Sequence, residues 1–347
     1  MVNYENVGLI QFLVFNGGLL GLELQTLIQT TLRHIFQDKE DRKEWRTTEN
    51  CLTWGADPNY RFHNGYPWMW HAIKSASAER DQHHSWTKQE KACRDVQLLL
   101  DHGVDPNSVG SLATMDSMLH AACLHFQPQI VQALLKAGAH PNAKDARGRT
   151  PLFMLFEECW LNVHQNEYLL DMLLADPRVK IDEPDNDGCT PLGAAASCIA
   201  TVSREFAKKV VRMPDEVDIN SQDKNGETPF SRSIAVNEYD TIRLLLAQDR
   251  LDPNLGPTDA FPLFLAVRLN QQQTVEYLLD SKRLNVNKQT STGQTALLEA
   301  IRVGNTDVIR MLAKAGANAD IGMSEGRTAR QQMSAAGIYI KWKTSPI

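Results

Sequence analysis

Residues 55–59 read Gly-Ala-Asp-Pro-Asn, and the phrase returns as Gly-Val-Asp-Pro-Asn at 103–107 and Gly-Ala-His-Pro-Asn at 138–142. Weaker copies follow towards the C-terminus. Taking the last polar residue of each copy as a marker gives intervals of 48, 35, 40, 38, 34, 33 and 33 residues between Asn59, Asn107, Asn142, Asp182, Asn220, Asn254, Asn287 and Asp320. A period near 33 residues indicates a stacked helical array. Such an array offers an extended surface instead of one deep cleft.

Each period carries the signals of two short helices. In the unit at 221–254, residues 223–226 (Asp-Lys-Asn-Gly) predict a turn, because glycine tolerates positive φ and aspartate can bond nearby backbone. Thr228 and Pro229 then predict a helix start, with threonine as the cap and proline at the first helical position. A second helix packed on a core is predicted by the spacing of Ile242, Leu245 and Leu246.

The helix start recurs as Gly-Arg-Thr-Pro-Leu at 148–152 and Gly-Cys-Thr-Pro-Leu at 188–192, and most completely as Met-Leu-His-Ala-Ala at 118–122. These residues closely resemble the ankyrin repeat, whose pattern includes Gly-x-Thr-Pro-Leu-His-x-Ala-Ala and ends near Gly-Ala-Asp-x-Asn. The resemblance covers roughly residues 50–333. It implies an all-α ankyrin-type solenoid of about seven full units plus terminal caps, with helix-turn-helix units and β-hairpin-like fingers. It also implies a structural role for His120, whose imidazole would bond backbone between fingers.

Three parts are predicted along the chain: an N-terminal capping segment or degenerate repeat at 1–59, a repeat array at 60–320, and a C-terminal capping repeat at 321–347. The longest interval places an insert at about 75–91, and a second long interval places one around 157–167. Inserts in arrays are expected in loops, often on the binding side.

Composition narrows the class of protein. The chain has 347 residues, 42% of them hydrophobic and 22% charged, as in a soluble folded protein. A net charge of -6 without a basic run argues against nucleic acid as a partner. The six cysteines show no CxxC pair and are predicted to be reduced, buried thiols.

The apolar stretch at 7–22 has two interpretations, a buried N-terminal segment and a targeting signal. No basic residue precedes it, no small-residue cleavage site follows it, and it is too short to span a bilayer. The buried segment is therefore favoured, no membrane partner is predicted, and the expected location is intracellular: cytoplasmic, with the nucleus as an option.

The resemblance also implies a binding surface, because finger tips and the exposed turn of each first helix line a concave groove in ankyrin arrays. The matching finger positions are Arg147, Arg149, Asn186, Asp187, Lys224, Asn225, Glu227, Ser291 and Gln294. The matching helix positions are Lys74, His125, Glu157, Glu158, Arg268 and Arg302. Together they predict a mixed-charge groove for another protein, although for any one of these residues ordinary solubility is the favoured explanation.

The N-terminal half is rich in large rings. Five of the seven tryptophans lie between Trp45 and Trp86, and nine of the ten histidines lie between His63 and His164. Residues 66–71 (Tyr-Pro-Trp-Met-Trp-His) put Trp68, Trp70 and His71 where the repeat usually has Thr-Pro-Leu-His. Two interpretations stay open: hot spots for a partner or a flat ligand, or rings that fill a core enlarged beneath the insert.

No coherent catalytic set is recognisable, since the chain has no Walker loop, GxSxG, Rossmann glycine set or kinase signature. Acid–base candidates are limited to a pairing of His71 or His125 with Glu157 or Glu158. The acidic and histidine residues at 79–84 lack the i, i+4 spacing of a helical zinc pair, so a solvated loop is favoured there and neither metal nor cofactor is predicted.

The predicted function is therefore a non-catalytic scaffold or adaptor that binds a protein partner through its groove. The alternative is an unconventional enzyme or small-molecule binder that uses Trp68, Trp70 and His71. A third possibility, part of a larger receptor-like protein, is disfavoured by the cap-like ends.

Overall fold

The computed structural model describes residues 45–53, 56–62, 64–75, 85–110, 113–157, 163–322, 326–335 and 337. The chain forms two compact units. Unit 1 comprises Met1–Leu155 with Asp171–Val179, and unit 2 comprises Phe156–Leu170 with Lys180–Ile347. Helices α8 (Met154–Glu157) and α9 (Val163–Ala175) contribute residues to both.

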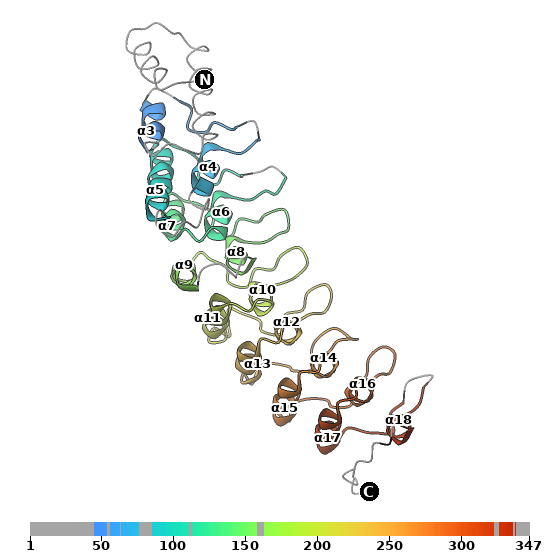
Figure 1. The fold of residues 1–347 in the computed structure, drawn as a ribbon. Coiled ribbons are helices and arrows are strands. Elements are labelled where there is room, and N and C mark those ends of the chain that lie inside the picture. The colour runs from blue at the N-terminus through green and yellow to red at the C-terminus, as the bar shows by residue number, and fades with distance from the viewer. Residues whose placement is uncertain are drawn as a thin grey trace, which may run out of the picture. The chain divides into compact units, whose positions relative to one another are not determined.

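Unit 1 is built from two rows of helices (Figure 1). Helix α4 packs on α5 and α6, α5 packs on α3 and α7, and α6 packs on α7 and the 3-10 helix η1. The bounds are α3 (Trp45–Thr53), α4 (Trp68–Ser75), α5 (Ser85–Asp101), α6 (Met118–Leu124), α7 (Pro128–Lys136) and η1 (Pro151–Phe153).

Unit 2 continues the same pattern. The first helices α10, α12, α14, α16 and α18 pack in series, and the second helices α11, α13, α15 and α17 form a parallel series. The loops project from the side of the first helices (Figure 1). The bounds are α10 (Pro191–Ala196), α11 (Thr201–Val210), α12 (Pro229–Ala235), α13 (Tyr239–Leu246), α14 (Pro262–Arg268), α15 (Gln272–Asp280), α16 (Ala296–Val303), α17 (Thr306–Lys314) and α18 (Ala329–Ala335).

The predicted all-α repeat fold is confirmed. No strand of a sheet is found in the described ranges, and the fingers carry isolated bridges such as Val109 with Ser117. The predicted helix start is also confirmed: the Thr228 hydroxyl accepts the Ser231 amide at 3.0 Å, and Ser231 Oγ accepts the Thr228 amide at 2.9 Å. The second-helix stripe of Ile242, Leu245 and Leu246 is buried as predicted.

The asparagines that mark the period join one repeat to the next. Asn254 Nδ2 donates to the Arg283 carbonyl at 3.0 Å, and Asn254 Oδ1 accepts the Asn285 amide at 2.7 Å. Asn220 makes the same two bonds, at 2.8 Å each, to the Arg250 carbonyl and the amide of Asp252. The side chain that reveals the period in the sequence is thus the one that satisfies backbone groups between consecutive repeats.

Three arginines outside the predicted pattern cap the second helix of the preceding repeat: Arg178, Arg250 and Arg283. Arg250 donates to the carbonyls of Val217 at 2.7 Å and Val211 at 3.3 Å, just beyond α11. Arg283 reaches the carbonyls of residues 246, 248, 249 and 251, just beyond α13. Carbonyls at a helix C-terminus have no partner within the helix, so a guanidinium with several donors satisfies them together.

We expect Arg283→Ala to lower the free energy of unfolding by about 1 kcal/mol, because charge-assisted bonds are lost while water regains access to the carbonyls. Urea titration followed by circular dichroism measures this loss. Lys314→Ala, in the exposed last turn of α17, is the matched control and should change stability by less than about 0.5 kcal/mol. Equal effects of the two substitutions would show that the arginine does not cap α13.

The two inserts are not simple loops, which corrects the prediction for part of each. Residues 85–91 begin the 17-residue helix α5, and residues 163–167 begin α9. In α5 the fully buried Ala92, Val96 and Leu99 follow helical spacing, so the extra residues extend a helix that the core already holds. Residues 76–84 and 158–162 lie outside the described residues.

The cysteines are also more varied than predicted. Cys51, Cys93, Cys123 and Cys189 are free thiols, in agreement with the sequence analysis, whereas Cys198 is disulfide-bonded, which is a correction. Burial raises the pKa of the Cys189 thiol to about 11, so it stays protonated and unreactive at neutral pH.

Several sequence-based predictions concern residues that the structure does not describe, including the apolar stretch at 7–22, most of the capping segment at 1–59 and residues 338–347 of the C-terminal cap. In the described part of the chain, each helix is too short or too polar to cross a bilayer.

Candidate functional site

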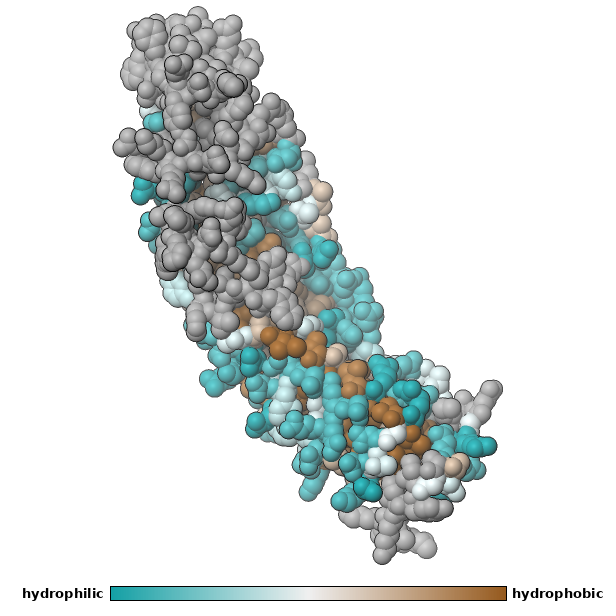
Figure 2. Space-filling model, viewed as in Figure 1, coloured by the Kyte–Doolittle hydropathy of each residue, from teal (hydrophilic) through white to brown (hydrophobic). Residues whose placement is uncertain are grey.

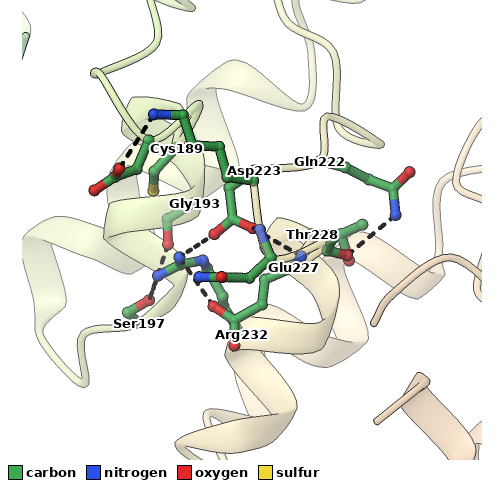
Figure 3. Close-up of polar contacts among 12 residues, drawn as sticks. Cys189, Gly193, Ser197, Gln222, Asp223, Glu227, Thr228 and Arg232 are labelled. Atoms are coloured by element: carbon green, nitrogen blue, oxygen red, sulfur yellow. Dashed lines mark hydrogen bonds and ion pairs between the residues drawn. The ribbon is translucent and has the colours of Figure 1, made fainter. Parts of the chain in front are cut away.

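The side chain of one arginine links a finger of unit 2 to helix α12 (Figure 3). Arg232 on α12 donates to Asp223 Oδ2 at 2.5 Å, and it forms an ion pair with Glu227 Oε2 at 2.9 Å. Its second nitrogen donates to the hydroxyl of Ser197, the C-cap of α10, at 3.2 Å. Asp223 is 2% exposed and also accepts the amides of Asn225 and Glu227. The finger is therefore held rigidly against two first helices.

This network sets the charge of the finger. Burial opposes ionisation of Asp223, but the bond from Arg232 and the amides of Glu227 and Asn225 outweigh it and hold the pKa of the carboxyl below its ordinary value. Glu227, predicted as a partner contact, has its carboxylate engaged by Arg232. Its first role in the structure is to support the finger.

The other residues of unit 2 that were predicted to contact a partner lie in the fingers and the first helices, and most of their charges are paired. Lys224 Nζ lies 3.6 Å from Asp187 Oδ1, and both side chains are mostly exposed. Arg302 pairs with the buried Glu299 at 2.7 Å, and the Arg268 guanidinium lies 5.9 Å from the Phe264 ring. The exposed members of the predicted set are Asn186, Asp187, Lys224, Asn225, Arg268, Ser291 and Arg302.

In unit 1 the predicted contacts divide into exposed and structural residues. Arg147 and Lys74 are exposed, and His125 is half-buried as the C-cap of α6. Arg149 instead pairs at 2.6 Å with Asp145, whose side chain is 1% exposed. The Arg149 carbonyl lies 2.9 Å from His120 Nε2, which confirms the structural role predicted for that histidine.

A cluster of half-buried rings lies between the first described finger and α4. This aromatic finger patch consists of Tyr60, Phe62, Tyr66, Trp70 and His71. The rings of Tyr66 and Trp70 are stacked with centroids 3.9 Å apart, and the rings of Phe62 and His71 meet edge-on at 4.6 Å. The sequence analysis missed three of these residues. The signal was present in the alternation Tyr60-Arg61-Phe62, which puts both rings on one side of an extended finger.

Cationic and backbone groups border the patch. The exposed Lys74 ammonium lies 4.7 Å from the Trp70 ring centroid, a cation–π distance. A Cβ placed at Gly110 would lie 2.6 Å from Trp70 Cδ1, so glycine there lets the backbone of the next finger meet the ring edge. The patch thus extends across two neighbouring fingers of unit 1.

Trp68 does not belong to this surface, which corrects its prediction as a ligand contact. It is 0% exposed and fills the core of unit 1, whereas Trp70 is half-buried in the patch. Two residues along a helix correspond to a rotation of about 200°, so the two tryptophans face opposite sides of α4. The core interpretation therefore holds for Trp68, and of the two rings only Trp70 is accessible to a partner or a ligand.

Acid–base chemistry finds little support at His71. Burial, reinforced by the charge of Lys74, lowers the pKa of His71 to about 4, so the imidazole is neutral at pH 7. Its Nε2 lies 3.3 Å from the amide nitrogen of Asn64. The side chain of Glu157 and the whole of Glu158, its predicted acidic partners, lie outside the described residues, as do the acids and histidines at 79–84. Elsewhere in the described ranges, no group of three or more His, Cys, Asp or Glu side chains could hold a metal ion.

Comparison with known families agrees with this architecture. A family model for ankyrin repeats (three copies) matches residues 119–209, 199–290 and 263–336, which is more than half of the chain. This chain belongs to the ankyrin repeat family. Ankyrin repeats generally mediate protein–protein interaction.

Ankyrin proteins of very different origin are similar to it. Human rabankyrin-5 (Homo sapiens) is 27% identical over 224 residues, which cover 64% of this chain and 17% of that protein. Ankyrin repeat protein OPG189 of Variola virus is 24% identical over 213 residues, 59% of this chain and 35% of that protein. Mouse neurogenic locus notch homolog protein 1 (Mus musculus) is 32% identical over 141 residues, 40% of this chain and 5% of that protein. The chain spans far less than two thirds of each relative, so the similarity supports the repeat and not a shared activity.

Proposed function

We propose that this protein is an interaction scaffold that binds a protein partner on the finger side of unit 1, with the aromatic finger patch at the centre of the contact. The observation that carries the proposal is the stacked pair Tyr66 and Trp70 under the exposed ammonium of Lys74. Rings of this size, already held in place, lose little conformational freedom on binding and dominate interface energies.

The surroundings of the patch suit a protein contact. Interfaces combine an apolar, aromatic centre with a polar rim. Here the rim is supplied by Arg61 and Lys74, which are exposed, and by Arg147 on a later finger of the same unit. Arg61 is itself oriented, because it donates to the carbonyls of Gly65 at 2.8 Å and Val109 at 3.0 Å.

The test is affinity capture from the native lysate, followed by titration of the recovered protein against variants. We expect Trp70→Ala to weaken binding at least tenfold, about 1.4 kcal/mol. Lys74→Glu reverses one exposed charge and removes the cation–π contact with Trp70, and it should weaken binding several-fold. Lys314→Ala, in unit 2, should leave affinity unchanged. Recovery of a protein that binds the wild type, Trp70→Ala and Lys74→Glu equally would refute the placement of the contact, and retention of a metabolite alone would refute the scaffold.

A further inference from the structure

We propose that the second helices of unit 2 form a separate binding site for an acidic peptide segment of a protein partner, centred on Arg243. The site is a groove of about 550 Å³ between α11, α13 and α15. These helices follow one another in the second row, on the side away from the finger loops (Figure 1). The proposal is independent of the aromatic finger patch in unit 1.

The groove combines cationic walls with a short apolar floor. Arg204 and Lys208 line it from α11, Arg243 lines it from α13, and the floor is formed by Leu244, Ala247 and Tyr277. A volume of this size lies within the range of about 300–1,000 Å³ seen for ligand sites. In Figure 2 the face of unit 2 towards the viewer carries both hydrophilic (teal) and hydrophobic (brown) residues.

Three cations and two carboxylates line the groove, and both carboxylates are already engaged. Arg204 holds Asp240 at 3.0 Å and lies 3.7 Å from Glu238, while Lys208 holds Glu205 at 2.7 Å. In the described part of the chain, Arg243 forms no ion pair. With Glu238 counted beside Arg204, three positive charges face three negative ones, and in the described ranges Arg243 is the cation of this set that has no carboxylate partner.

The chain contains an internal comparison that isolates this arginine. Helices α13 and α17 begin Tyr-Asp-Thr-Ile-Arg and Thr-Asp-Val-Ile-Arg, so Arg243 and Arg310 occupy the same helical position, three residues after an aspartate. In α17 the pair forms, with Arg310 3.0 Å from Asp307. In α13 the aspartate is instead held by Arg204 of the preceding repeat. The guanidinium of Arg243 is therefore left for another acceptor.

The position of Arg243 is also fixed in advance. Its guanidinium carbon lies 5.9 Å from the ring centroids of both Tyr239 and Tyr277, and the two rings are 6.0 Å apart. The three centres form an almost equilateral triangle, so the guanidinium lies beside both rings, and its donor fork matches a carboxylate with two parallel bonds. An Asp or Glu side chain on Arg243, with a neighbouring apolar residue on Leu244 and Ala247, would satisfy both parts of the groove.

The test is fluorescence anisotropy of the full chain with labelled 12-residue peptides that carry two Asp or Glu residues flanking one Leu or Tyr at varied spacing. Peptides with Asn and Gln in place of the acids serve as neutral counterparts. We expect the best acidic peptide to bind with a Kd below about 100 μM and more weakly as salt rises. Arg243→Gln should weaken binding at least tenfold, whereas Arg310→Gln and Trp70→Ala should change it less than twofold.

Three results would overturn the proposal. They are equal binding of acidic and neutral peptides, equal losses in Arg243→Gln and Arg310→Gln, and full competition by inorganic phosphate or free glutamate at the peptide's own concentration. The last result would show a general anion site. Circular dichroism of each variant confirms that the repeats remain folded.

Discussion

Arg232→Ala is expected to lower the free energy of unfolding by about 3 kcal/mol, because it leaves a buried carboxylate without its cation. Asp223 is 2% exposed and Arg232 is 23% exposed, so the value lies near the lower end of the range for broken buried pairs. The substitution also removes the bridge from α12 to Ser197 on α10. The loss therefore affects both the finger and the packing of consecutive repeats.

The pH dependence gives this prediction a second readout. Asp223 has a folded pKa below its ordinary value of 3.8, so the stability gained from the pair is present above that value and is lost as pH falls through the folded pKa. Without Arg232 the carboxyl is protonated more easily in the folded protein. The difference between wild type and Arg232→Ala should thus be largest near pH 7 and shrink below about pH 4.

Urea unfolding at pH 7 and at pH 3.5 measures both effects. The exposed pair of Arg310 and Asp307, with side chains 63% and 59% exposed, provides the control. Arg310→Ala should cost less than about 0.5 kcal/mol at either pH. A loss for Arg232→Ala as small as the control's would show that water replaces the guanidinium at Asp223.

The repeat and its helix starts were predictable because their signals are local. Thr228 caps within three residues and the marker residues recur at intervals of 33 to 48 residues, so both can be read from a single sequence. Arg232, Arg243 and Arg283 were not predicted. Arg232 reaches Ser197 and Arg283 reaches carbonyls of the preceding repeat, so these contacts depend on how two repeats are registered. Arg243 is left without a carboxylate because Asp240 pairs with Arg204 of the preceding repeat. The spacing of residues within one repeat does not determine how that repeat is aligned with its neighbour.

The same limit explains the aromatic segment. The sequence located the unusual rings at 66–71 but could not decide between core and surface. The decision rests on where α4 begins: with Trp68 as its first residue, Trp68 faces the core and Trp70 faces the fingers. A shift of the helix start by a residue or two would exchange their roles. Site residues in such arrays are thus predictable as a segment before they are predictable one by one.

Two of the marker residues, Asp182 and Asp320, are aspartates instead of asparagines, and the acid of Asp182 is expected to weaken the contact between its repeat and the next. Asp182 Oδ2 accepts the Asp218 amide at 2.9 Å, as an asparagine would, but its buried Oδ1 has no hydrogen-bond partner in the described part of the chain. Asn254 and Asn220 each donate to a carbonyl two residues before the amide that they accept. By that register Oδ1 of Asp182 stands opposite the Glu216 carbonyl. A carboxylate cannot donate there.

Asp182→Asn is therefore expected to raise the free energy of unfolding by about 2 kcal/mol at pH 7, since it supplies the missing donor and removes a buried, unsatisfied oxygen. Burial raises the pKa of Asp182, with the Asp218 amide and Arg250 opposing and the Asp218 charge adding to the rise. The loss of stability caused by ionised Asp182 is therefore complete above the pKa of the folded state and absent below pH 3.8. The stability gained by Asp182→Asn should accordingly shrink as pH falls towards 3.8.

Urea titrations from pH 7 to pH 4 measure this gain in stability. Asn220→Asp is the reverse control and should destabilise the protein by a similar amount at pH 7. If the gain in stability did not depend on pH, or if there were none, Asp182 would not face a carbonyl. The side chains at the marker positions would then not be what aligns this repeat with the next.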